Sequence, residues 1–175
     1  FIGNVKKEVI INNIEVYPES TGYQKICNIN SDHLIIDFGG QTVDVSLFSE
    51  NKLIDANSYQ LGTNIMFGKI ASIINKRYGT DYGVLEIEKS HTLGTLVVEN
   101  KEMNIDYSNF LYDHLQEVIT NIKNDFPWKK SIKSFIGGGS LLFKPYLETK
   151  FDIHDEAYLA NVKSYYAIGS GRYEY

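Results

Sequence analysis

Apolar residues in the first third of the chain are grouped in short runs that turn residues separate. Residues 33–38 (HLIIDF) form a continuous apolar run of the kind found in a buried strand. Two glycines follow this run, and residues 43–48 then alternate between apolar and polar positions. A polar turn separates these residues from residues 53–59, so we predict three consecutive antiparallel strands. Residues 8–17, rich in β-branched side chains and interrupted by Pro18, predict another strand.

Apolar residues at three- and four-residue steps predict helices in the rest of the chain. The predicted helices cover residues 63–78, 107–125, 140–150 and 157–168. Thr63 is the candidate cap of the first helix, and residues 132–136 predict a short strand. Within residues 81–103, we expect a short helix near residues 84–89 and a strand or hairpin at residues 95–103. The fold class that these elements predict is α/β, with a mixed sheet, an antiparallel three-strand meander and flanking helices.

Composition and charge exclude several classes of function. The chain has 175 residues and 43% hydrophobic content, which is enough for a buried core. Its 22 acidic and 17 basic residues give a net charge of -5, and the lysines are scattered, so we expect no direct binding of nucleic acid. No apolar run is long enough to cross a bilayer, so we expect no membrane association. Cys27 is the single cysteine, which fits a reducing compartment and predicts a cytoplasmic location.

The first candidate site is the glycine turn within residues 37–44 (DFGGQTVD). The turn between the two predicted strands consists of Gly39, Gly40, Gln41 and Thr42. Glycine lets the backbone come close to a ligand, so the N–H groups of this turn can surround phosphate oxygens. Asp37 would then hold a hydrated Mg²⁺, which proteins usually bind with one or two carboxylates and phosphate oxygens. The alternative is a plain hairpin in which the glycines serve only the turn.

The second candidate site is a run of three glycines between the strand at residues 132–136 and the helix after it. Gly137, Gly138 and Gly139 would let a nucleotide rest on the backbone and on the start of the helix. No Gly-Lys-Ser/Thr sequence follows, so this is no Walker loop. The alternative is tight packing of the strand against the helix.

The third candidate is Glu19, which follows a predicted strand in the sequence YPES. A carboxylate in this position can orient or activate the water that attacks a γ-phosphate. On its own, an acidic residue after a proline in a turn is ordinarily just exposed to solvent.

Taken in this order and at these separations, the three segments resemble the actin, sugar-kinase and heat-shock-chaperone ATPase superfamily, which has a ribonuclease-H-like fold. IIDFGGQTVDVS is similar to its second phosphate loop, FIGGGSLL to its adenosine motif, and VYPES to the segment that carries the catalytic glutamate in ParM-type plasmid segregation proteins. The closing residues YLANVKSYYAIGS are similar to the C-terminal helix of that group.

The resemblance implies a role for each motif. Asp37 would lie near Mg²⁺ and bind it through water, residues 39–42 would surround the β- and γ-phosphates of ATP or GTP, residues 137–139 would lie beneath the nucleoside, and Glu19 would position water. The resemblance also implies a core nucleotide-binding subdomain and a smaller variable one. The core subdomain would consist of residues 1–62 and 126–175, and the smaller one of residues 63–125.

The resemblance further implies a split site. The first phosphate loop of the superfamily has no counterpart before Glu19, so we interpret the chain as domain II of a longer ATPase whose domain I is absent, and expect no efficient turnover from it alone. Gln41 also departs from the pattern, because many relatives have a glycine or a small polar residue there. If domain I is absent, the apolar face of the C-terminal helix favours a dimer.

The function that the resemblance implies is ATP-driven filament formation for plasmid partition, with self-association and a DNA-bound adaptor protein as partners. Two alternatives stay open. One is a sugar or small-molecule kinase with the same fold, and the other is a non-catalytic interaction module that retains the scaffold.

Overall fold

The structure, a computed structural model, describes residues 19–147, 151–153 and 156–171, together with the single positions 8, 10, 14 and 16. The strand predicted at residues 8–17 therefore lies mostly outside the described residues and stays a prediction.

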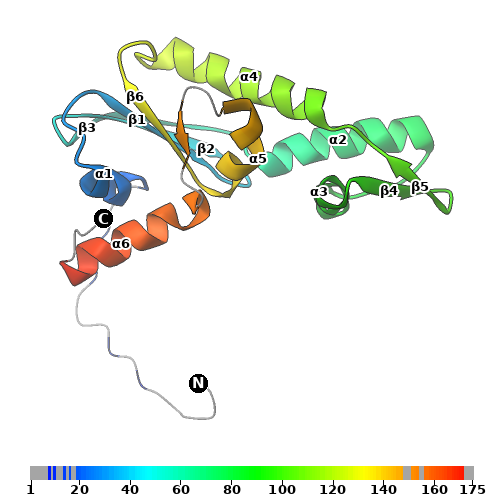
Figure 1. The fold of residues 1–175 in the computed structure, drawn as a ribbon, viewed down its shortest axis with the longest axis horizontal. Helices are drawn as coiled ribbons and strands as arrows, with labels where there is room; N and C mark the ends of the chain where they lie inside the picture. The colour runs from blue at the N-terminus through cyan, green and yellow to red at the C-terminus, as the bar shows by residue number, and fades with distance from the viewer. Residues whose placement is uncertain are drawn as a thin grey trace.

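A five-stranded mixed sheet forms the centre of the molecule (Figure 1). Strands β1 (His33–Phe38), β2 (Val43–Ser49) and β3 (Lys52–Tyr59) form an antiparallel meander. On the other side of β1, β6 (Ile132–Ile136) runs parallel to it, and β7 (Asp152–Ile153) runs parallel to β6. The strand order is β3-β2-β1-β6-β7, which confirms the predicted meander within a mixed sheet.

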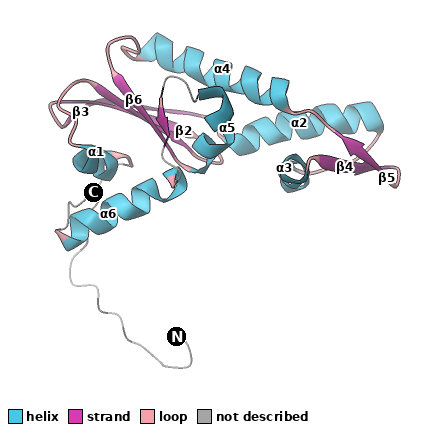
Figure 2. Cartoon of the chain, viewed as in Figure 1, coloured by secondary structure: helices cyan, strands magenta, loops and turns pink. Residues whose placement is uncertain are grey.

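Helices cover both faces of this sheet (Figure 2). On one face lie α2 (Thr63–Tyr78), α4 (Ser108–Asp125) and α5 (Gly138–Leu147), and on the other lie α1 (Thr21–Cys27) and α6 (Ala160–Ser170). A 3₁₀ turn, η1, leads into α6 at Ala157–Leu159. The predicted α/β fold class is thus confirmed. In the described part of the chain, no helix combines the length and the apolarity that crossing a membrane requires.

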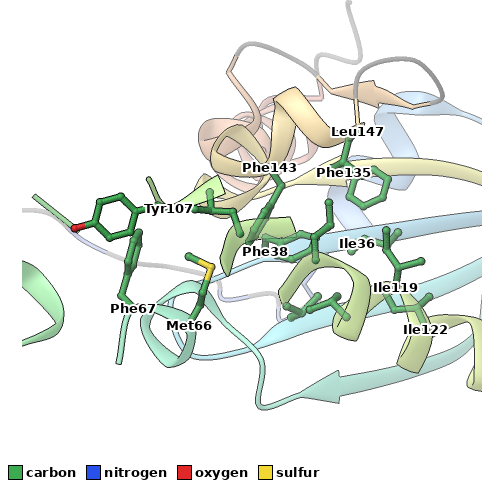
Figure 3. Packing of buried hydrophobic residues seen from close by; sticks show 14 of the residues in the cluster. Ile36, Phe38, Met66, Phe67, Tyr107, Ile119, Ile122, Phe135, Phe143 and Leu147 are labelled. Atoms are coloured by element: carbon green, nitrogen blue, oxygen red, sulfur yellow. The ribbon is translucent and has the colours of Figure 1, made fainter. Parts of the chain in front are cut away.

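Successive side chains of β1 point to opposite faces of the sheet, so the core is divided between the two helical layers. Ile36 and Phe38 point into the larger cluster with α2, α4 and α5, whereas Ile35 points toward α1 and α6. The larger cluster contains the ring of Phe38 (Figure 3). Its centroid lies 5.1 Å from the ring centroid of Phe143 and 6.2 Å from that of Phe135. Since helices cover both faces, every residue of β1 is buried, which explains its continuous apolar run.

A smaller group of elements lies at the end of the molecule away from α1 and α6 (Figure 1). It contains α3 (Val84–Leu93) and a separate two-stranded sheet of β4 (Thr95–Val98) and β5 (Lys101–Asn104). This confirms the hairpin and the short helix, which is four residues longer than predicted. Ile87 and Leu96 join the same hydrophobic cluster as the main sheet, so the division into two subdomains stays a prediction.

Two local predictions were wrong, and one helix was not predicted. Residues 21–27 form α1, which was missed because a seven-residue helix is too short to show a clear period. Gly62, and not Thr63, is the N-cap of α2, and no side-chain cap bond is present. Helix α5 begins at Gly138 rather than residue 140, since only Gly137 of the three glycines has the left-handed backbone of a turn.

Candidate functional site

The glycine turn between β1 and β2 rests on the first residues of α2. Three successive carbonyl groups of the turn accept hydrogen bonds from three successive amides at the start of this helix. These bonds are Thr63 N to Gly39 O (3.1 Å), Asn64 N to Gly40 O (2.8 Å) and Gly62 N to Gln41 O (3.0 Å). The turn is therefore held by the helix and is not a free surface hairpin.

Gly62 is required for this contact. A Cβ atom at residue 62 would lie 2.4 Å from the carbonyl oxygen of Gly40 and 2.4 Å from the carbonyl carbon of Gln41, so no side chain fits. Gly62 was not predicted as part of the site, because nothing in the local sequence shows that another loop approaches it.

The amides of the turn are available for a ligand. Gly39 donates to the carbonyl oxygen of Thr42 at 2.9 Å. By contrast, the hydrogen bonds found among the described residues leave the N–H groups of Gly40, Gln41 and Thr42 without an acceptor. Gly40 and Gln41 are exposed, so these amides can bind an anion. The hydroxyl of Thr42 donates to Asp44 Oδ2 at 2.8 Å, which fixes the second end of the turn.

Asp37 lies near the end of β1, on the face that α1 and α6 cover. Its side chain is 6% exposed and lies opposite Asp44 in the β1–β2 register. Asn161 of α6 donates a hydrogen bond from Nδ2 to Asp37 Oδ2 at 2.6 Å. Burial raises the pKa of Asp37, and the negative charges of Glu19 and Asp44 raise it further, whereas the bond from Asn161 opposes them.

Glu19 lies immediately before α1 and is exposed. Its negative charge raises the pKa of both Asp37 and Tyr165, so the fold brings the two predicted catalytic carboxylates into one electrostatic environment. The next residue, Ser20, has a left-handed backbone and donates from its hydroxyl to Ser46 on β2 at 2.8 Å. This bond holds the start of α1, and with it Glu19, at the sheet.

Two of the three glycines at the end of β6 lie where no side chain fits. Gly137 has a positive φ of 81°, and a Cβ there would lie 2.2 Å from Asp37 Oδ1. A Cβ at residue 139 would lie 2.8 Å from both Phe38 Cβ and Thr63 Cγ2. The glycine run thus packs directly against β1, the residues after it and α2.

Gly138 differs from its two neighbours. It is exposed, and a Cβ at this position would meet no atom within 4 Å. The first turn of α5 therefore opens toward free space at the same sheet edge as the turn at residues 39–42. Behind it, the buried hydroxyl of Ser140 donates to the carbonyl oxygen of Ile136 and fixes the start of the helix.

The side chains at this edge fit a magnesium ion that a single carboxylate binds through water. Among the described residues, no group of three or more His, Cys, Asp or Glu is arranged to hold a metal ion. Mg²⁺ does not need such a group, because it usually keeps several waters and binds one or two carboxylates and the phosphates of its ligand. Asp37 fits the part of a single carboxylate that binds through water, since its Oδ2 is already held by Asn161.

Asn161 was not predicted as a site residue. The residues of α6 that are buried are Ala160, Ser164 and Ala167. Their spacing marks the inner face of the helix, and a polar side chain beside that face was the signal that could have identified Asn161. Its partner could not have been found this way, because Asp37 lies 124 residues earlier in the chain.

Among known proteins, only solved structures match this chain. No protein-family model matches the sequence, and no curated protein matches it. Ta0583, an archaeal actin homolog, matches with a TM-score of 0.77 and 16% identity, covering 89% of this chain and 55% of that one. The ParM of a 15-stranded filament from Clostridium botulinum matches with a TM-score of 0.77 and 13% identity, covering 95% of this chain and 56% of that one.

A third match is MreB5 of Spiroplasma citri bound to ADP, with a TM-score of 0.68 and 17% identity, covering 90% of this chain and 60% of that one. The same MreB5 bound to AMPPNP and Ta0583 in complex with ADP also match. The chain therefore has an actin-like ATPase fold, with ParM among its structural neighbours, and spans between 55% and 60% of the three structures described.

Proposed function

We propose that this chain is the nucleotide-binding half of a bacterial actin-like ATPase that takes ATP, or GTP, together with magnesium. One observation carries the proposal: the free amides at residues 40–42 and the open glycine at residue 138 lie at the same edge of the sheet. This edge is formed by the carboxyl ends of the adjacent parallel strands β1 and β6, the place where open α/β sheets bind ligands.

In this proposal, residues 39–42 surround the β- and γ-phosphates, which the amides of Gly40, Gln41 and Thr42 bind, and residues 137–139 lie beneath the nucleoside. Asp37 holds magnesium through water, and Glu19 orients the attacking water. When bound, the magnesium ion neutralises the charge of the phosphates. The exposure of Glu19 and the burial of Asp37 suit these two parts, because water reaches Glu19 freely whereas Asp37 keeps a fixed position.

We further propose that a second domain completes the site and that the whole protein hydrolyses ATP while forming filaments. The filament of the ParM from Clostridium botulinum, an actin-like neighbour of which this chain covers 56%, supports this. Plasmid partition in the cytoplasm, with a DNA-bound adaptor, is the role that we propose for such filaments. Tyr158 in η1 and Val162 and Tyr166 on α6 are exposed at four-residue steps, which supports a dimer of the isolated chain.

The nucleotide site is tested by replacing Gly138 with leucine. Because a side chain there meets no protein atom, we expect the Gly138→Leu variant to unfold at the same temperature as the wild type or above it. Its binding of Mg-ADP in calorimetry should be lost, because the side chain fills the space for the nucleotide. Gly169→Leu is the matched control, since Gly169 is also an exposed helical glycine with open space around it. Equal Mg-ADP binding by the wild type and both variants would refute the site.

The filament role is tested on the longer protein by sedimentation and phosphate release with and without Mg-ATP. Pelleting together with hydrolysis supports a filament ATPase. Phosphorylation of a metabolite without pelleting favours the sugar or small-molecule kinase instead. A wild type that releases no phosphate favours the non-catalytic interaction module. A Glu19→Ala variant that hydrolyses as fast as the wild type contradicts the part proposed for Glu19.

A further inference from the structure

The first turn of helix α6 contacts a carboxylate of the candidate phosphate site. Asn161 lies in its first turn and donates from Nδ2 to Asp37 Oδ2 at 2.6 Å. This distance is short for an N–H donor, and hydrogen bonds to charged acceptors are shorter than those between neutral groups. Asp37 is almost completely buried, so the bond is shielded from water and strong. Helix α6 is thus bonded directly to the carboxylate of the site.

The side chain of Asn161 makes this contact but also lowers the stability of the fold. Its Oδ1 is buried and has no hydrogen-bond partner among the described residues. A buried acceptor without a partner destabilises a protein, and an apolar side chain of similar size would avoid the loss. Packing alone therefore does not explain an asparagine at this position, whereas a bond to Asp37 does.

The carboxylate of Asp37 is fixed from two sides. Its Oδ1 lies against Gly137, where a Cβ would come within 2.2 Å, and its Oδ2 accepts the bond from Asn161. The glycine run of the second candidate site and α6 thus hold the same group. A change in the position of α6 would therefore remove one of the two contacts of this carboxylate.

Helix α6 is also joined closely to α1, which follows Glu19. A Cβ at Gly22 would lie 2.8 Å from Ser164 Cβ, so the two helices touch through their smallest residues. Ser164 is fully buried and its hydroxyl bonds to the carbonyl oxygen of Ala160, which leaves the contact surface flat and apolar. Helix α6 therefore contacts the elements that carry both candidate carboxylates, Asp37 directly and Glu19 through α1.

We propose that Asn161 is a positioning residue that holds the carboxylate of Asp37 in place and thereby couples the docking of α6 to nucleotide binding. The inference rests on the proposed function, because it assigns a purpose to Asp37. Coupling of this kind is reciprocal: a ligand that needs Asp37 in its held position stabilises α6, and a docked α6 strengthens ligand binding.

The contact itself is tested without nucleotide by a double-mutant cycle on the unfolding equilibrium in urea. We expect Asn161→Ala to raise the unfolding constant about tenfold, as for the loss of a bond to a charged group. Asn161→Asp should raise it further, because it places a carboxylate against Asp37. The exchanged pair Asp37→Asn with Asn161→Asp should recover stability, since the amide and carboxylate again face each other. Lys163→Ala, a change at an exposed residue of α6 outside its apolar face, is the matched control.

The coupling is tested by hydrogen exchange of the α6 amides with and without Mg-ADP. If opening of α6 releases the nucleotide, Mg-ADP at about 100 times its Kd should slow this exchange by up to about 100-fold in the wild type and in Lys163→Ala. Asn161→Ala should bind Mg-ADP about tenfold more weakly and show less protection when it is saturated to the same degree.

The outcomes separate the two proposals. Additive effects in the cycle, with no recovery in the exchanged pair, overturn the inference whatever the nucleotide does. Recovery together with ligand-dependent protection of α6 supports it. If the cycle shows recovery but the wild type binds no Mg-ADP, the proposed function fails, and the coupling fails with it while the contact stands. If Mg-ADP binds and α6 exchange does not change, the coupling alone is wrong.

Discussion

His33 makes the stability of this protein dependent on pH. The side chain is fully buried on β1, and both ring nitrogens have a partner. Gln24 Nε2 donates to Ile29 O and to Asn51 Oδ1, so Gln24 Oε1 is left as the acceptor for His33 Nδ1–H at 2.5 Å. His33 Nε2 then accepts from the hydroxyl of Ser134 at 2.9 Å. The site is built for a neutral imidazole.

The size of the effect follows from the pKa of this side chain. Burial lowers the pKa of His33 from 6.5 to about 4. The unfolded chain therefore binds a proton below pH 6.5 that the folded protein does not bind. As a result, the free energy of unfolding decreases as the pH falls. The contribution of neutral His33 is complete above pH 6.5 and is lost between pH 6.5 and about 4. The total loss is about 3 kcal/mol, at 1.36 kcal/mol for each pH unit.

The assay is urea unfolding of the wild type and of His33→Gln at a series of pH values from about 7.5 to about 4. Burial also lowers the pKa of His91 and His114, so the wild type loses stability from more than one group. Both groups are present in the variant, and their contributions cancel in the difference between the two proteins.

Glutamine can donate and accept but cannot take up a proton, so the variant should lack the part of the pH dependence that comes from His33. We expect the stability advantage of the wild type to shrink by about 3 kcal/mol between pH 7.5 and pH 4. A difference that stays constant over this range would refute the reasoning, because it would mean that His33 has the same pKa in the folded and unfolded chains.

Two further predictions concern the packing around the site, and a third concerns one surface contact. Gly137→Ala should destabilise the protein by at least ~3 kcal/mol in urea unfolding, because the positive φ and the contact with Asp37 Oδ1 both oppose a side chain; a loss below ~1 kcal/mol would contradict the geometry. Phe143→Ala should cost ~3–5 kcal/mol by the same assay, since Phe143 is fully buried against Phe38; a Phe143→Leu variant that is equally destabilised would show that lost volume is not the cause. Lys69→Ala should change thermal stability by less than ~1 kcal/mol, because its ion pair with Glu117 at 3.0 Å is half exposed to solvent; a larger loss would mean that the pair is better shielded than its exposure indicates.

Much of the fold could be predicted because its elements carry strong local patterns. β1 is apolar except for His33 and Asp37, and the spacing in α4 repeats from Leu111 to Ile122, so each pattern extends over most of its element. Residues 39–42 and 137–139 were identified for the same reason, since glycine runs next to strands are visible in the sequence alone. The places where prediction failed are short: α1 has seven residues and β7 has two. Such elements depend on packing and not on their own propensity.

The sequence by itself determined which segments are strands and helices and where glycine allows the backbone to come near a ligand, because these properties depend on residues close together in the chain. Only the tertiary structure decided that the two glycine runs lie at one sheet edge, that Gly62 supports the first of them, and that Asn161 holds Asp37. Each of these contacts joins residues far apart in sequence, and no local pattern encodes the partner. The parallel pairing of β1 with β6 brings the two glycine runs to one edge. The helices packed on the two faces bring Gly62 and Asn161 within hydrogen-bond distance of their partners.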